Sequence, residues 1–348
     1  MSVCMVSPVK MHVKTSTRGI YETFDFRGLS ADGRYAFTLK HTVFKPWLGH
    51  GSITVAMICF DHKTTKTQSF YEQEELSATQ KTQLNHADHW ENCTFSFATG
   101  SFFEISRDVL RGKLHTQQGS MSWHLNVQRH DEVLQQFPQT ICYHLPWPRH
   151  KIQVRDCFLR YYGKIQCAGL SLSGEFSGSN HHYWGDGYPV EYAAAQCNHF
   201  AEDTGAFFYG FSARLSASKL FTTPYLSMAS LKLHGRWYHF NQVRKSFHHH
   251  VEALDNYRWR ITFLNANYGL NVDIDGRNPR MQAWVGWHAE RSLGGRSVIK
   301  MTPFAVGAVT LYRRGSMELI TELTTHDMEL KTLLPENHPE TSGFWIAP

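Results

Sequence analysis

The sequence predicts an all-β, antiparallel fold, and two properties of the chain support this. Aromatic residues make up 14% of the 348 residues and charged residues only 19%, a balance that favours sheets with large buried surfaces over helical bundles. Runs of alternating apolar and polar residues recur between short turn sequences, as in antiparallel meanders that form barrels or sandwiches. At this length we expect two domains or one large β architecture.

The first predicted strand lies in YETFDFR, which begins at residue 21. In an extended chain Glu22, Phe24 and Phe26 share one face, while Asp25 and Arg27 share the other. Alternation predicts further strands at 34–44, 52–60, 121–128, 257–264 and 268–275. Turn sequences are found at 31–33, 98–101, 174–179, 184–189, 274–279 and 292–297.

The sequence LPWPRH, at 145–150, holds two prolines within three residues. This spacing disfavours a continuous central strand and indicates that a domain boundary lies at or after this point. We therefore predict one β domain over residues 1–165 and a second over residues 166–348.

The charge and cysteine content narrow the class of protein. The net charge of +5 is spread along the chain without a basic stripe, so we expect no nucleic-acid partner. The seven cysteines form no CxxC pair and are expected to be reduced thiols. We find neither a signal peptide nor a run of about 18 apolar residues, which predicts a cytoplasmic protein without a transmembrane segment. Peripheral membrane contact and the oligomeric state are left open.

The stretch NHHYWGDGYPVEYAAAQCNHF, at 180–200, concentrates polar and aromatic side chains. If its second half is extended, Tyr192, Ala194, Gln196, Asn198 and Phe200 share one face. Alanines leave room for a ligand, and the two amides offer oriented hydrogen bonds. A polar network that pins a domain interface would use the same residue types, so both interpretations stay open.

Familiar catalytic motifs are missing from the sequence. It contains no HExxH, GxSxG, GxGxxG or Walker A motif and no Cys/His finger. We therefore expect neither a metal nor an organic cofactor.

The residues at 22–27 and 181–200 resemble the tocopherol cyclase-like and carotenoid hydratase-like superfamily of lipocalin-like proteins. Glu22, Phe26 and Arg27 match its N-terminal E-G-W-Y-F-R. The central signature, E-K-N-W-G-x-x-F-P and then W-x-W-x-Q-x-N-x-F, is matched by Trp184, Gly185, Pro189, Gln196, Asn198 and Phe200. The chain departs from the signature at His181 and His182, which replace Glu-Lys, at Tyr183, which replaces Asn, and at Tyr192 and Ala194, which replace Trp. The likeness spans roughly residues 20–315.

This resemblance implies two lipocalin-like antiparallel β-barrel domains that bind a hydrophobic, isoprenoid-like molecule in a barrel cavity or at the domain interface. It further implies a cofactor-independent cyclase or hydratase that protonates an olefin. The candidate proton donors are Glu22, His181, His182 and Asp186. The candidate ligand contacts are Phe24, Arg27, Tyr183, Trp184, Tyr192, Gln196 and Asn198. A non-enzymatic carrier of a hydrophobic small molecule is the alternative.

The donors differ in what the sequence expects of them. Glu22 is a donor if it faces an apolar cavity, and otherwise a solvated strand residue. Imidazole titrates near neutrality, so a histidine donor should give an activity limb at about pH 6–8. Because His181 and His182 are neighbours on a strand, they should point to opposite faces, and only one should serve.

Overall fold

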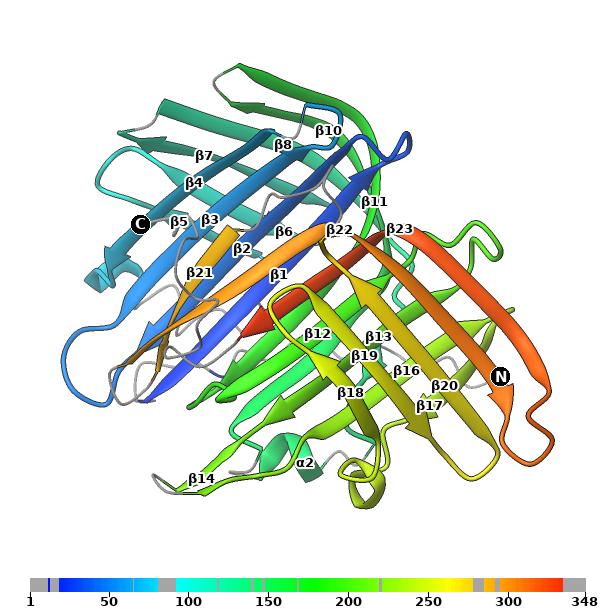
Figure 1. The fold of residues 1–348 in the computed structure, drawn as a ribbon. Helices are drawn as coiled ribbons and strands as arrows, with labels where there is room; N and C mark the ends of the chain where they lie inside the picture. Colours follow the sequence, from blue (N-terminus) through cyan, green and yellow to red (C-terminus); the bar gives the residue numbers. More distant parts are fainter. Residues whose placement is uncertain are drawn as a thin grey trace.

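The computed structural model describes residues 12, 19–64, 66–80, 92–117, 119–138, 141–145, 148–167, 169–218, 221–277, 285–291 and 295–333. Within this part of the chain nearly all regular structure is β-strand (Figure 1). The exceptions are a helical segment at residues 78–80, a one-turn helix, α2 (Ile141–His144), and a 3-10 turn, η1 (Val243–Lys245).

The first sheet is antiparallel and has the strand order β4-β3-β2-β1-β11-β10-β8-β7-β6-β5, with β9 beside β10. Its strands are β1 (Ile20–Ser30), β2 (Tyr35–Lys45), β3 (Ser52–Asp61), β4 (Lys66–Glu75), β5 (Asn92–Ser96), β6 (Phe102–Ser106), β7 (Val109–Thr116), β8 (Gly119–Arg129), β9 (Leu134–Gln135), β10 (His150–Cys167) and β11 (Leu170–Gly185).

The second sheet has the order β17-β16-β13-β12-β23-β22-β20-β19-β18, with β21 beside β22. Its strands are β12 (Glu191–Cys197), β13 (Phe207–Arg214), β16 (Leu226–Leu233), β17 (Arg236–Phe240), β18 (His250–Leu254), β19 (Arg258–Leu264), β20 (Tyr268–Asp275), β21 (Val285–Arg291), β22 (Gly295–Arg313) and β23 (Leu319–Leu333). A separate hairpin joins β14 (Ser216–Ser218) to β15 (Phe221–Thr222).

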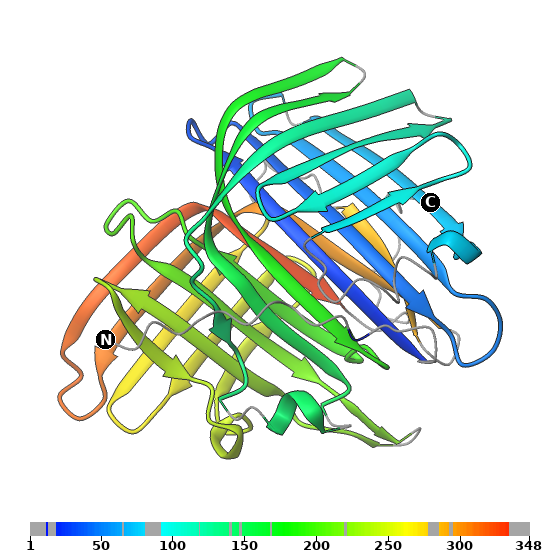
Figure 2. The ribbon, with the colours of Figure 1, turned by 180° about the vertical axis from the view of Figure 1, so that it is seen from behind.

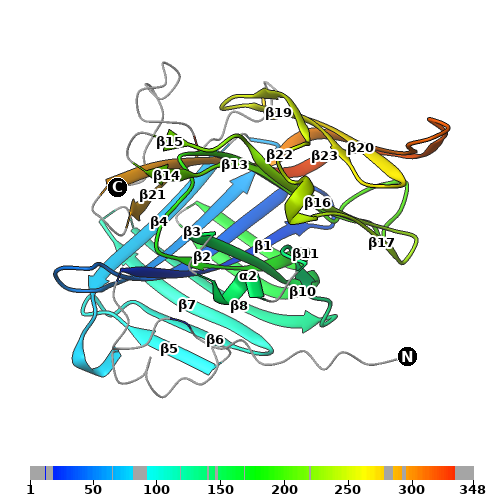
Figure 3. The same ribbon diagram turned by 90° about the horizontal axis from the view of Figure 1, so that it is seen from below.

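Each sheet curls into a half-barrel around its own apolar core, and the two half-barrels lie against each other (Figures 1 and 2). Seen from below, the second sheet lies over the first (Figure 3). The all-β prediction and the two lipocalin-like domains are confirmed.

Two further apolar clusters fill the space between the sheets. One joins Leu29 and Phe60 of the first sheet to Met301 and Leu333 of the second. The other joins β9 and β10 to β13 and β16. Burial of these surfaces favours a fixed relation between the two half-barrels.

Strand β1 lies at the centre of this arrangement and is buried on both faces. Every residue after Ile20 is buried, because Phe24 and Phe26 pack in the first core while Leu29 packs between the sheets. Asp25 and Arg27 therefore point from the first sheet toward the second, as their contacts with Lys331 and Glu329 show. The predicted separation of the two faces of this strand is confirmed.

One predicted turn is wrong. Residues 174–179 lie inside β11, which pairs with β10 on one side and with β1 on the other. Gly178 is needed there for close approach, because a Cβ atom at this position would lie 1.8 Å from the carbonyl oxygen of Arg27. The glycines in this stretch belong to a strand interior and not to a turn.

The chain passes from the first sheet to the second between Gly185 and Glu191. The boundary predicted between residues 165 and 166 falls within β10 of the first sheet, and it stays a prediction about independent folding units. The helices among the described residues are all too short or too polar to span a lipid bilayer.

We predict that Gly178→Ala lowers the free energy of unfolding by about 1–3 kcal/mol, because the added methyl group forces β1 and β11 apart. Urea unfolding followed by circular dichroism measures the change. Gly315→Ala is the matched control, since a Cβ atom there meets no atom within 4 Å. Equal stability of the two variants would contradict the close approach.

Candidate ligand-binding site

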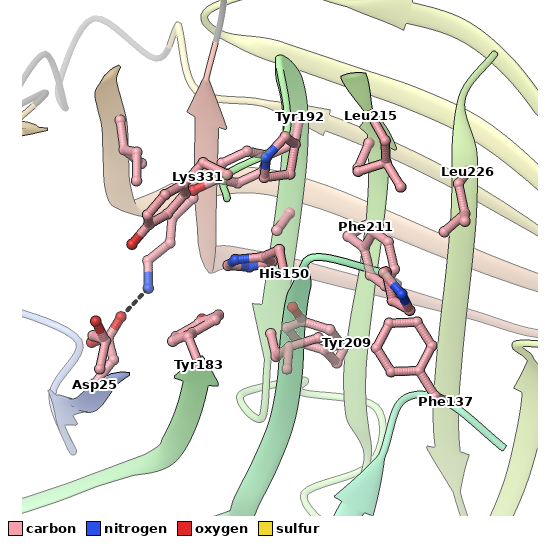
Figure 4. A pocket seen from close by; sticks show the side chains of 18 of the residues that line it. Asp25, Phe137, His150, Tyr183, Tyr192, Tyr209, Phe211, Leu215, Leu226 and Lys331 are labelled. Atoms are coloured by element: carbon pink, nitrogen blue, oxygen red, sulfur yellow. Dashed lines mark hydrogen bonds and ion pairs between the residues drawn. The ribbon is translucent and has the colours of Figure 1, made fainter. Parts of the chain in front are cut away.

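A partly open cavity lies between the two sheets, and we call it the interface cavity (Figure 4). Asp25 of β1, Lys40 of β2 and Lys331 of β23 lie in its charged end. Phe137, Phe211 and Leu226 lie in its apolar end, on the far side of His150 (Figure 4). The cavity is therefore amphipathic along its length.

Tyrosines form much of the wall between these ends. Tyr183, Tyr188, Tyr192 and Tyr209 all line the cavity. Burial raises the pKa of each phenol above its ordinary value, so all four keep their hydroxyl hydrogen at neutral pH. They offer aromatic surface together with neutral hydrogen-bonding groups.

The cavity volume is about 60 Å³. This is room for a few water molecules and less than the roughly 300–1,000 Å³ of most ligand pockets. A larger molecule therefore has to displace wall side chains as it enters.

The charged end is built around the Lys331 ammonium group, which contacts both Asp25 and Glu329, the latter at 2.6 Å. Burial alone would lower the pKa of Lys331, but the two carboxylates raise it above its ordinary value. For Glu329, burial opposes ionisation while Lys331 and Arg27 favour it, and its pKa falls to about 2. Both groups are charged at neutral pH.

Lys40 of β2 lies directly opposite Asp25 of β1 in the strand register. Burial lowers the pKa of its ammonium group to about 8, and Asp25 partly opposes that shift. Lys40 is thus a cavity-lining group that exchanges protons close to neutral pH.

Arg27 crosses from the first sheet to the second. Its Nε lies 3.3 Å from Glu329, and both side chains are almost fully buried. The guanidinium also donates to the carbonyl oxygens of Gln196 at 3.2 Å, Pro303 at 3.1 Å and Asp327 at 2.7 Å. A buried arginine with this many acceptors is fully compensated.

His181 and Gln196 complete a polar layer at the inner edge of the cavity. Gln196 Nε2 donates to Glu329 Oε2 at 2.9 Å, and Gln196 Oε1 meets His181 Nε2. The other ring nitrogen of His181 lies 3.0 Å from the Tyr183 hydroxyl. Burial lowers the pKa of His181 to about 4, so the ring is neutral at pH 7.

Four of the predicted site residues gather elsewhere, on the first-core side of the first sheet. Glu22 Oε1 lies 2.8 Å from His182 Nε2 in a fully buried pair. The His182 ring stacks between Phe24, at 4.2 Å between centroids, and Trp184, at 4.5 Å. The backbone N–H of His12 donates to both Glu22 oxygens, at 3.1 and 3.0 Å.

The two adjacent histidines therefore point to opposite faces, as the strand period predicted. Burial lowers the pKa of His182 as well as that of His181. The expectation of titration near neutrality is wrong for His181, because burial lowers the pKa of its ring to about 4.

The remaining predicted residues are spread out. Asp186 is 40% exposed and pairs with Arg149 at 2.9 Å on the surface. Asn198 donates to the carbonyl oxygen of Gly178 at 2.9 Å and lines a second hollow, more open to solvent, of about 740 Å³. Tyr192 and Tyr183 line the interface cavity, and Gln196 and Arg27 lie in the polar layer.

Sequence reasoning missed Lys40, His150, Tyr209, Glu329 and Lys331. The alternation of ELKTL at 329–333 places Glu329 and Lys331 on one face, but it gives no sign that this face is covered by another sheet. No cluster of three metal-binding side chains is found in the described part of the chain.

The sequence matches no protein-family model and no curated protein. Three solved structures are similar in fold. CghA with Sch210972 has a TM-score of 0.55 at 11% identity and covers 95% of this chain and 96% of its own. A Nitrosomonas europaea protein assigned as AttH has a TM-score of 0.48 at 12% identity, covering 89% and 91%. Kievitone hydratase from Nectria haematococca has a TM-score of 0.46 at 8% identity, covering 95% and 94%. The chain thus has the fold of two lipocalin-like domains that it shares with CghA.

Proposed function

We propose that the protein binds a mainly apolar small molecule in the interface cavity and converts it by cofactor-independent cyclisation or hydration. One observation carries this proposal: the interface cavity has aromatic walls, an apolar end and a charged end made by Asp25, Lys40 and Lys331. Such a cavity suits a molecule with an apolar body and one oxygen-bearing end. An isoprenoid or a polyketide-like chain has this shape.

The fold supports the binding part of the proposal. The structure of CghA, which shares this fold at a TM-score of 0.55, contains Sch210972. A two-domain lipocalin-like protein can therefore hold a small molecule. At 11% identity the likeness carries no further information about the ligand of this chain.

The lining groups supply charge and protons without a cofactor. The Lys331 ammonium can polarise a carbonyl or hydroxyl oxygen in a site with little water, where such an interaction is strong. Lys40 can give or take a proton near neutral pH. The tyrosine rings can stabilise positive charge that develops on the ligand.

Incubation of the purified protein with an organic extract of its own host tests the conversion. Mass spectrometry should find one compound consumed and one formed, with equal mass after cyclisation or with the mass of one water added after hydration. Ala194→Leu, which places a larger side chain in the cavity, should abolish this conversion. A compound that co-purifies unchanged would show a carrier and overturn the enzymatic part.

We predict that Lys40→Met weakens binding of the fluorescent probe 2-naphthoate about tenfold, because a charge-assisted contact to the carboxylate is lost. Ala194→Leu should abolish binding by filling space. Fluorescence titration measures both effects. Lys113→Met, an exposed change in the first sheet, is the control. Equal affinity in the unaltered protein and all three variants would rule out the interface cavity as the binding site.

We predict that His181 makes the protein sensitive to acid. Its pKa is about 4 in the folded chain and about 6.5 unfolded, so only the unfolded chain takes up a proton between these values. Stability is complete above pH 6.5 and falls by up to about 1.4 kcal/mol per pH unit down to pH 4.

His181→Gln should remove this part of the pH dependence, measured as urea unfolding at pH 7.5 and pH 4.5. His124→Gln is the control, because His124 is exposed and its replacement should leave the pH dependence of stability unchanged. An unchanged difference between the two pH values in His181→Gln would contradict a neutral, buried His181.

A further inference from the structure

The hydrogen-bond directions in the polar layer are fixed by Glu329. Its carboxylate is ionised beside Arg27 and Lys331, so both oxygens can only accept hydrogen bonds. The Gln196 side chain lies 2.9 Å from Oε2, and only its amide NH₂ group can donate there. The amide oxygen of Gln196 must therefore point the other way.

That oxygen points at His181. It accepts a hydrogen bond from the Ser179 hydroxyl at 2.8 Å and also contacts His181 Nε2. An amide oxygen carries no hydrogen, so Nε2 must be the protonated nitrogen of the neutral ring. Nδ1 of His181 is then a bare acceptor.

Tyr183 completes the series. Its hydroxyl lies 3.0 Å from His181 Nδ1, and the buried phenol keeps its hydrogen at neutral pH. The hydroxyl hydrogen is therefore directed to Nδ1. Tyr183 lines the interface cavity, and a hydroxyl oxygen that donates its hydrogen can still accept a hydrogen bond through a lone pair.

We propose that Tyr183 is the acid–base residue of the interface cavity, that it accepts a hydrogen from a hydroxyl group of the substrate, and that His181 takes up the hydrogen Tyr183 releases. This inference rests on the proposed function, and it narrows the substrate to an apolar molecule that carries a reacting hydroxyl group. Gln196 and Glu329 are positioning residues, which set the tautomer of His181 as the third member of a catalytic triad sets its base.

The step balances without a co-reactant. The substrate O–H bond breaks and its hydrogen bonds to the Tyr183 oxygen, while the former Tyr183 hydrogen moves to His181 Nδ1. The substrate oxygen forms a bond to an alkene carbon conjugated with a carbonyl group, and the alkene electron pair moves toward that carbonyl. The hydrogen then returns through Tyr183 to the carbon next to the carbonyl, so the product is a cyclic isomer.

The position of the charges suits this step. The Lys331 ammonium lies 5.8 Å from the centre of the Tyr183 ring, in the same end of the cavity. It can stabilise negative charge on a carbonyl oxygen while Tyr183 acts on the hydroxyl. Burial and Lys331 disfavour the imidazolium formed at His181, while Asp25, Glu329 and the bond to Gln196 favour it, so this charge is transient and the hydrogen returns.

Nuclear magnetic resonance of protein labelled with ¹⁵N-histidine tests the tautomer without any ligand. At pH 7 the spectrum should show His181 as the Nε2–H form, assigned by the signals that disappear in His181→Gln. Gln196→Met should allow the Nδ1–H form to appear, since the amide oxygen that accepts the Nε2 hydrogen is then lost and the Ser179 hydroxyl, 3.4 Å from Nε2, can donate to that nitrogen instead. An Nδ1–H ring at His181 in the unaltered protein would overturn the proposal.

Small aromatic probes test the acceptor role of Tyr183. In fluorescence titrations 2-naphthol should bind about fivefold to tenfold more tightly than 2-methylnaphthalene, which lacks the hydroxyl group. Tyr183→Phe should abolish this preference, whereas Tyr192→Phe, at another cavity tyrosine, should keep it.

A preference that survives in Tyr183→Phe would overturn the assignment of Tyr183 while leaving the cavity as a binding site. If neither probe binds the unaltered protein, the proposed function fails instead, because the interface cavity is then closed to aromatic molecules. In that case the ¹⁵N-histidine spectrum still tests the hydrogen-bond directions from Glu329 to Tyr183.

Discussion

The buried contact between Arg27 and Glu329 is the interaction on which the interdomain region depends. Arg27 Nε of β1, in the first sheet, lies 3.3 Å from Glu329 Oε2 of β23, in the second, and both side chains are almost fully buried. Removing one member of such a pair typically costs about 3–5 kcal/mol, because the remaining charge is buried alone. Since Arg27 also donates to three carbonyl oxygens of the second domain, it fixes how the two half-barrels meet.

The polar layer of His181, Gln196 and Glu329 lies between the interface cavity and the second, more open hollow. Successive residues on one face of a strand are two positions apart. Strands β11 and β23 both pass from one hollow to the other through the polar layer. On β11, Tyr183 lines the interface cavity and Ser177 the outer hollow, with His181 and Ser179 between them. On β23, Lys331 and Asp327 line the two hollows, with Glu329 between them. On both strands, residues two positions apart thus line first the interface cavity, then the polar layer and then the second hollow.

Much of the fold could be predicted from local patterns, because strand alternation depends on neighbouring residues only. The opposite orientation of His181 and His182 follows from that period alone. The environment of each face could not be predicted in the same way. Lys331 and Asp25 meet although they lie about 300 residues apart, and polar residues that alternate on a strand look the same whether water or a second sheet covers them. The turn predicted at 174–179 was wrong for a related reason, since the need for Gly178 arises from the backbone of β1.

The distance in sequence between Arg27 and Glu329 has a consequence for synthesis of the protein. All strands of the first sheet precede residue 186, so this half-barrel can form while the second is still being translated. Glu329 is added about 300 residues after Arg27, which takes about 15–60 s at roughly 5–20 residues per second. Throughout that interval Arg27 lacks the carboxylate with which it pairs in the complete fold. The interface cavity can therefore be completed only after β23 has been made, because Lys331 of that strand lines it.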